Sequence, residues 1–174
     1  RAIPNLSVYS PSDRFEVVTT MTMAYQAKAA VYLRMGKSDV GDIHKYVPQA
    51  QVGQLLQVKR GSAGALAFIA TGSMVRMVID IANECYPNAT VWSAPFIKPI
   101  DARLVREICA QSCALVVVEE HSVMGGLGSV ITEISTEFEP VPVLRVGVRD
   151  RFSHHCGSYQ YLLTEHGLDR PAIE

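Results

Sequence analysis

Apolar residues follow two patterns that alternate regularly after residue 54. Short continuous apolar runs, typical of strands buried on both faces, occupy residues 55–58, 65–70, 90–93, 114–118 and 142–146. Between several of these runs, apolar residues three and four positions apart predict helices that begin near residues 74, 102 and 127, with Asp101 as the cap of the second. Strands and helices in this order predict an α/β fold with a three-layer, mainly parallel sheet that helices cover on both faces.

The first part of the chain predicts a separate strand–helix–strand unit. Residues 6–9 and 29–33 predict strands, the second of them buried and ending at Arg34. Between them a helix is expected to about residue 28, with Ser10 as its cap, Pro11 at its first position and Asp13 near its free N–H groups. Residues 37–53 lose this periodicity and gather turn-forming residues, which predicts a linker. A terminal helix is expected at 159–166.

Composition excludes several broad classes of protein. Of the 174 residues, 48% are hydrophobic and 19% are charged, a balance typical of a folded domain and not of a disordered chain. Sixteen basic and 17 acidic residues give a net charge of −1, so no nucleic-acid partner is expected. No apolar run approaches the roughly 20 residues that span a bilayer, so no membrane association is expected.

The cysteines indicate neither a disulfide framework nor a zinc site. They are Cys85, Cys109, Cys113 and Cys156. Cys109 and Cys113 are four residues apart, a spacing that on a helix places both thiols on one buried face. Free thiols favour a reducing, cytoplasmic compartment. The adjacent His154, His155 and Cys156 do not supply four converging ligands, so no metal site is expected.

Two turns between a strand and a helix are candidate anion sites, because backbone N–H groups at such turns can hold a phosphate. The candidate residues are Gly125, Gly126 and Gly128 at one turn and Thr71, Gly72 and Ser73 at the other. The glycine turn lacks the third glycine of a dinucleotide-binding motif and the lysine of a P-loop. Tight turning at the first and helix capping at the second are the stronger interpretations.

Charged residues at strand ends are the remaining candidates. Arg34 follows an apolar strand, where open α/β sheets bind ligands, and its guanidinium suits a phosphate or carboxylate as well as a structural salt bridge. Glu119 and Glu120 are adjacent at a strand end, so their side chains are expected to point to opposite faces and not to form an acid/base pair. No catalytic residue is identified.

Several motifs together resemble the transketolase-type thiamine diphosphate enzymes. The segments IPNL at 3–6, SPSD at 10–13 and VYLR at 31–34 are similar to the end of their pyrimidine-binding domain. Five further segments occur in the order and approximate spacing of their carboxy-terminal domain: ATGS at 70–73, FIKPID at 96–101, VEEH at 118–121, MGGLGS at 124–129 and GVRDRF at 147–152. The resemblance implies the end of a pyrimidine-binding domain at 1–36, a linker at 37–53 and a carboxy-terminal domain at 54–174.

The resemblance also implies a function for the complete enzyme, which would transfer a two-carbon ketol unit between sugar phosphates with thiamine diphosphate and Mg. Arg34 matches the arginine that binds substrate phosphate in the sugar-phosphate members, and Asp101, Glu119 and Glu120 are implied to serve domain packing and subunit contacts. The family's diphosphate-and-magnesium domain and its cofactor-activating glutamate have no counterpart in these residues. The isolated chain is therefore expected to be inactive and without cofactor, and a homodimer or a partner subunit would carry the missing domains.

Several alternatives remain open at this point. Within the family, transketolase or its split second subunit, 1-deoxyxylulose-5-phosphate synthase and the beta subunits of 2-oxo acid dehydrogenases share this layout, and Arg34 favours the sugar-phosphate members. A candidate of another class is a non-catalytic regulatory domain that binds an anion or a nucleotide at the two turns.

Overall fold

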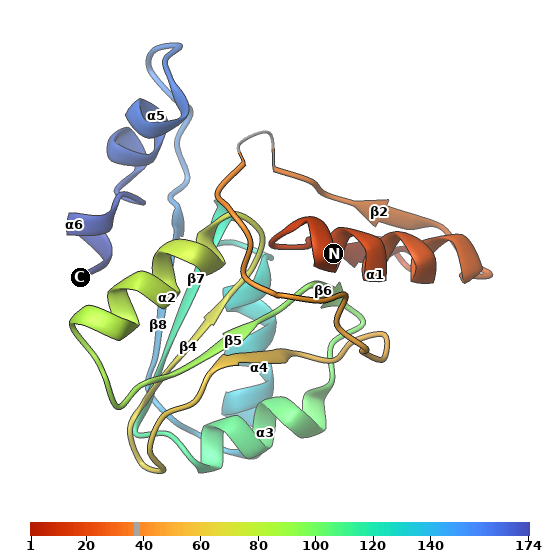
Figure 1. Cartoon of the computed structure of the whole chain (residues 1–174), viewed down its shortest axis with the longest axis horizontal. Helices are drawn as coiled ribbons and strands as arrows, with labels where there is room; N and C mark the ends of the chain where they lie inside the picture. Colours follow the sequence, from red (N-terminus) through yellow and green to blue (C-terminus); the bar gives the residue numbers. More distant parts are fainter. Residues whose placement is uncertain (37–38) are drawn as a thin grey trace.

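The computed structural model describes residues 1–36 and 39–174, and its larger part is built around a five-stranded sheet (Figure 1). The strands lie in the order β3-β5-β4-β7-β8. Their bounds are Leu56–Lys59 (β3), Leu66–Ala70 (β4), Thr90–Ser93 (β5), Ala114–Ser122 (β7) and Val143–Val148 (β8). Only the β3–β5 pair is antiparallel among these neighbours, which confirms the predicted mainly parallel sheet.

Helices cover both faces of this sheet and give the predicted three layers (Figure 1). Helix α2 (Met74–Glu84) packs on one face, and α3 (Ala102–Ala110) and α4 (Leu127–Phe138) pack on the other. Alternate residues of β4 point to opposite faces, so Ile69 joins the core with α3 and α4 while Phe68 joins the core with α2. The strand is therefore buried on both sides, as its continuous apolar run predicted.

The strand order places a topological switch between β4 and β7. From β4 the chain passes through α2 to β5 on one side, and from β5 through α3 to β7 on the other side of β4. In open α/β sheets, ligands bind at the carboxyl ends of the strands at such a switch. Residues that follow β4 and residues late in β7 are therefore the expected positions of a site.

A three-stranded sheet lies beside the larger one, formed by the red and orange first part of the chain together with β6 (Figure 1). Strands β1 (Ser7–Tyr9) and β2 (Val31–Leu33) are connected by α1 (Arg14–Gln26) and pair in parallel with each other. This confirms the predicted strand–helix–strand unit. Strand β6 (Phe96–Lys98) pairs antiparallel with β1 and was not predicted, because it depends on a partner far away in sequence.

Several local predictions were wrong for identifiable reasons. Asp13, and not Ser10, caps α1, because the helix begins at Arg14 and the Ser10 carbonyl, which at a cap would accept the first bond of the helix, accepts from the Gly72 N–H and the Thr71 hydroxyl. Tyr32 in β2 is 54% exposed, because β2 is an edge strand. Cys109 is buried but Cys113 is exposed, since α3 ends at Ala110 and the two thiols do not share a helical face.

The C-terminal segment forms α5 (Tyr159–His166), as predicted, and a short α6 (Arg170–Ile173), which the sequence did not indicate. Leu163 and Ile173 are buried in the core on the α2 side of the sheet. This packing positions Tyr159, the first residue of α5, near the carboxyl end of β7, where its hydroxyl donates to Glu120 at 2.9 Å. The tail is thereby connected to the region of the topological switch.

Part of the expected linker, residues 37–38, lies outside the described residues. Further along it, the Asp13 carboxylate accepts hydrogen bonds from the backbone N–H groups of Ile43 at 2.9 Å and His44 at 2.8 Å. The His44 Nε2 atom lies 2.9 Å from the carboxylate of Glu16, which is fully buried in α1. The start of α1 therefore holds this segment of the linker in place.

Candidate functional site

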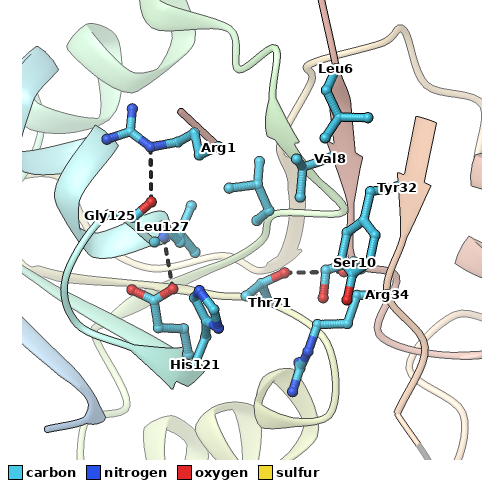
Figure 2. Close-up of a pocket in the computed structure, with 13 residues that line it drawn as sticks. Arg1, Leu6, Val8, Ser10, Tyr32, Arg34, Thr71, His121, Gly125 and Leu127 are labelled. Atoms are coloured by element: carbon cyan, nitrogen blue, oxygen red, sulfur yellow. Dashed lines mark hydrogen bonds between the residues drawn. The ribbon is translucent and has the colours of Figure 1, made fainter. Parts of the chain in front are cut away.

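A pocket of about 280 Å³ lies between the two sheets, at the carboxyl ends of β4 and β7. Figure 2 shows Arg34 and Tyr32 on one side of it and Arg1 and Leu127 on the other, with His121 between them. The wall from the small sheet is partly apolar, whereas the floor from the larger sheet is polar. The pocket therefore occupies the position that the topological switch predicts for a ligand.

Arg34 lines this pocket and is only partly committed to protein contacts. Its Nη2 donates to the Glu120 carbonyl oxygen at 2.8 Å and lies 3.7 Å from a carboxylate oxygen of the same residue. Among the residues that the structure describes, its Nη1 and Nε donate to no oxygen. Arg34 therefore lies near an acidic partner and still keeps free donors, which suit an anionic ligand.

The glycine turn before α4 is already occupied by a side chain of the protein. The carboxylate of Glu119 accepts hydrogen bonds from the N–H of Leu127 at 2.7 Å and from the N–H of Gly128 at 2.8 Å. Burial raises the pKa of Glu119, and the two backbone donors oppose that shift. Since these donors are satisfied internally, the turn is built to bind Glu119 and does not fit an added phosphate or diphosphate.

The glycines of this turn differ in what they contribute. A Cβ atom at Gly126 would lie 2.1 Å from a carboxylate oxygen of Glu119, and one at Gly128 would lie 2.9 Å from the side chain of Arg145. Gly125 has a φ of +78° with open space around it. Gly126 therefore permits the close approach of Glu119, Gly128 permits that of Arg145, and Gly125 permits the turn itself.

Thr71, Gly72 and Ser73 connect the two sheets. The Thr71 hydroxyl donates to the carbonyl oxygens of Ser10 at 3.0 Å and Ala94 at 2.8 Å, and the Gly72 N–H donates to the Ser10 carbonyl. The expected capping bond from Ser73 to α2 is not formed among the described residues. Its hydroxyl instead donates to the Glu120 carboxylate, so this turn serves packing and the network around Glu120.

Glu119 and Glu120 bind different partners, as expected for adjacent residues of a strand. Strand β7 continues beyond them to Ser122 because Ser122 pairs with Val148 in β8, so the prediction that the strand ends at Val118 was wrong. Glu119 binds the start of α4, whereas Glu120 accepts from Ser73 and from the hydroxyl of Tyr159. Neither carboxylate is paired with the other.

His121 is a pocket residue that was not selected as a candidate from the sequence. Partial burial and, secondarily, the positive charge of Arg34 lower the pKa of its imidazole. The ring therefore tends to be neutral near pH 7 unless an anion enters the pocket. Strand alternation was the available signal, because a residue two positions after Glu119 faces the same side of β7.

Comparisons with known proteins were consistent with this geometry. Residues 55–173, more than half of the chain, match the family described as Transketolase, C-terminal domain. The chain belongs to this family. The 1-deoxy-D-xylulose-5-phosphate synthases of Cupriavidus necator and Nitrosospira multiformis are 37% and 36% identical to it, over 100% and 99% of the chain.

Solved structures also resemble this member of the transketolase C-terminal domain family. A split-gene transketolase, described as an inactive beta4 tetramer, is 31% identical and superposes with a TM-score of 0.92 over 99% of this chain and 57% of that one. Transketolase from Campylobacter jejuni, at 16% identity and a TM-score of 0.67 over 99% of this chain and 26% of that one, shares the fold. The chain spans 28% of the length of the two synthases.

In the described part of this transketolase C-terminal domain, side chains that could ligate a metal do not form a cluster. No group of three or more His, Cys, Asp or Glu side chains converges within residues 1–36 and 39–174. The Leu127 and Gly128 N–H groups at the start of α4 are bound to Glu119, so they are not available to the diphosphate of thiamine diphosphate. No helix in the same ranges is long and apolar enough to cross a bilayer.

Asp101 lies outside the pocket lining of this transketolase C-terminal domain. Its carboxylate accepts a hydrogen bond from the N–H of Leu104 at 3.0 Å, so it caps α3 as the sequence predicted. The side chain is exposed. A contact with another subunit stays a prediction for Asp101.

Proposed function

We propose that this chain is the carboxy-terminal part of a transketolase-type enzyme that moves a two-carbon ketol unit between sugar phosphates. In this proposal, residues 1–36 end the pyrimidine-binding domain, residues 37–53 link it to the carboxy-terminal domain at 54–174, and a second copy or a partner subunit supplies the missing domains. The complete enzyme would be a cytoplasmic homodimer or a complex with that subunit. The family membership and the split-gene relative support this assembly.

Thiamine diphosphate, held with Mg by parts of the enzyme outside this chain, would supply the bond-breaking chemistry of the reaction. The role of this chain is to shape the end of the substrate site. Arg34 would bind the substrate phosphate, because a guanidinium with free donors in a partly buried pocket suits a phosphate monoester. The partly exposed Arg34 at the topological switch is the observation that carries this proposal.

Arg34→Ala in the complete enzyme tests this role. We expect the KM for glyceraldehyde 3-phosphate to rise about tenfold or more, with the KM for non-phosphorylated glyceraldehyde nearly unchanged. Arg34→Lys should lie between the two, because an ammonium group does not reproduce the geometry of the guanidinium. Arg103→Ala, on the exposed face of α3, is the matched control. Equal KM values for the phosphorylated substrate in wild type and Arg34→Ala would contradict the proposal.

A second candidate from the same family is 1-deoxy-D-xylulose-5-phosphate synthase, and the 37% and 36% identity to two such enzymes supports it. Arg34 would have the same role in either enzyme. Product analysis separates the two. Formation of 1-deoxy-D-xylulose 5-phosphate by the complete enzyme would favour the synthase, and exchange of ketol units between sugar phosphates would favour transketolase.

A regulatory nucleotide-binding function has less support from the geometry. The donors at the glycine turn are bound to Glu119, and the Thr71 and Gly72 N–H groups are bound to the carbonyls of Val118 and Ser10. Calorimetry of the chain with nucleotides and with thiamine diphosphate tests this alternative. Selective nucleotide binding would favour it, and tight thiamine diphosphate binding by this chain alone would contradict our account of the missing domains.

A further inference from the structure

Glu120 is the centre of a hydrogen-bond network that joins three parts of the fold. One of its carboxylate oxygens, Oε2, accepts hydrogen bonds from the Ser73 hydroxyl and, at 2.9 Å, from the Tyr159 hydroxyl. Ser73 immediately precedes α2, and Tyr159 is the first residue of α5 near the chain's C-terminus. The carboxylate of a residue in β7 is thus oriented by donors from two helices.

The other side of Glu120 faces Arg34. Its carbonyl oxygen accepts from Arg34 Nη2 at 2.8 Å, whereas its Oε1 atom lies 3.7 Å from the same nitrogen. That distance is too long for a hydrogen bond, so the carboxylate attracts the guanidinium without forming a bidentate pair. The side chains of Arg34 and Glu120 are 32% and 27% exposed, so neither is fully buried, and Arg34 lines the pocket.

These contacts decide how much of the guanidinium is available to a ligand. A bidentate pair with Glu120 would occupy two donors of Arg34 and would compete with a phosphate for the same atoms. The hydroxyls of Ser73 and Tyr159 hold the Oε2 atom of this carboxylate by hydrogen bonds. These bonds oppose the bidentate pairing of Glu120 with Arg34. The hydrogen bond from Arg34 to the Glu120 carbonyl also restricts the long arginine side chain before a ligand binds. This lowers the entropic cost of binding.

We propose that Ser73 and Tyr159 are positioning residues that act through Glu120 and keep the Arg34 guanidinium available for a phosphate monoester. Helix α5 is then a functional part of the phosphate site, although only its first residue reaches the network. This inference rests on the proposed role of Arg34. It gives α5, near the C-terminus of the chain, a role in the phosphate site that the other candidate site residues do not give it.

Tyr159→Phe is the direct test, because it removes one hydroxyl and keeps the ring. With inorganic phosphate as the probe, titrated into the chain and followed by the NMR signal of Arg34 Nε–Hε, we expect about three- to tenfold weaker binding. In the complete enzyme, KM for glyceraldehyde 3-phosphate should rise by a similar factor with little change in kcat. Tyr161→Phe on the same helix removes a hydroxyl that is outside the network and should bind phosphate like wild type.

A double variant separates positioning from a general loss of structure. Adding Glu120→Gln to Tyr159→Phe removes the charge that would pair with Arg34, so phosphate binding should recover toward the wild-type value. A defect caused only by damaged packing would not recover in this way. Wild-type phosphate affinity in Tyr159→Phe, or failure of Glu120→Gln to restore it, would overturn the positioning role.

The two proposals fail in distinguishable ways. Phosphate binding by Arg34→Ala is measured by calorimetry, because this variant lacks the Nε–Hε signal. If it binds phosphate as well as wild type does, the role of Arg34 itself is overturned, and the positioning role with it. If Arg34→Ala loses phosphate binding while Tyr159→Phe retains it fully, only the positioning role is overturned. Ser73→Ala provides a second, independent variant, because it removes the other donor to Glu120 Oε2, and it should weaken phosphate binding in the same direction.

Discussion

The carboxylate of Glu119 accepts the N–H of Gly128 at 2.8 Å, and a buried side chain late in β7 thereby caps the helix that follows it. A second bond from the N–H of Leu127 completes the cap. Since the first N–H groups of a helix have no partner within the helix, this carboxylate satisfies two donors that would otherwise be buried and unpaired. The position is therefore expected to be important for stability.

Glu119→Ala should lower the free energy of unfolding by about 1–3 kcal/mol for each donor left without a partner. Urea denaturation followed by circular dichroism measures this change. Glu137→Ala is the matched control, because Glu137 is an exposed glutamate on the same helix, and its loss should change stability by less than about 0.5 kcal/mol. Equal stability of Glu119→Ala and Glu137→Ala would contradict the capping role of Glu119.

Gly126→Ala should destabilise the protein by about 1–3 kcal/mol, because its Cβ would displace the Glu119 carboxylate from the cap. Gly125→Ala should cost about 1 kcal/mol for its left-handed backbone alone. The two causes separate in a Glu119→Ala background. There the cost of Gly126→Ala should largely disappear while that of Gly125→Ala persists, as measured by a double-mutant cycle in urea.

The sequence was most informative where local chemistry determines structure. Asp101 caps α3 and the helix at Tyr159–His166 has the predicted bounds, because a cap and an amphipathic turn depend on near neighbours. Ser10 was misassigned as a cap because its carbonyl accepts from the Thr71 hydroxyl, 61 residues away, and not from the start of α1. The same reason explains why β6 was missed, since only its pairing with β1 makes residues 96–98 a strand.

Part of the candidate site could be predicted because it depends on a local sequence signal. The end of an apolar strand identified Arg34 as a possible ligand contact, and it lies in the pocket. The roles of Glu119 and Glu120 were not foreseeable in detail, because they depend on which helix start lies above each face of β7. Tyr159 gave no signal at all, since its hydroxyl meets Glu120 only after the chain has returned across the sheet.

Asp101→Ala should lower the free energy of unfolding by about 1 kcal/mol, because it removes the acceptor for the Leu104 N–H at the start of α3. Asp101→Asn is the matched variant and should be close to wild type, since asparagine caps helices about as well as aspartate. Thermal denaturation at constant pH compares the three proteins. A large loss in Asp101→Asn would mean that the negative charge, and not the hydrogen bond, is what matters at this position.

The His44–Glu16 pair should make stability depend on pH near neutrality. The hydrogen bond to Glu16 raises the pKa of His44 above its ordinary value of about 6.5, in spite of the opposing effect of burial. A raised pKa means that the folded protein binds this proton more tightly than the unfolded chain does. The stabilisation is therefore complete below about pH 6.5 and is lost as the pH rises through the raised pKa of the folded state.

His44→Gln removes this titration and keeps a side chain that can donate to Glu16. We expect the wild-type protein to lose part of its free energy of unfolding between pH 6 and pH 8.5, and the variant to lose less over the same range. Urea denaturation at each pH gives both values, and an NMR titration of the His44 ring gives the pKa independently. Because His121 has its pKa lowered, its contribution falls as the pH drops below about 6.5, so His121→Gln is compared with the double variant that also carries His44→Gln. A stability of His121→Gln that rises from pH 6 to pH 8.5 would contradict the proposed charge state of the His44–Glu16 pair.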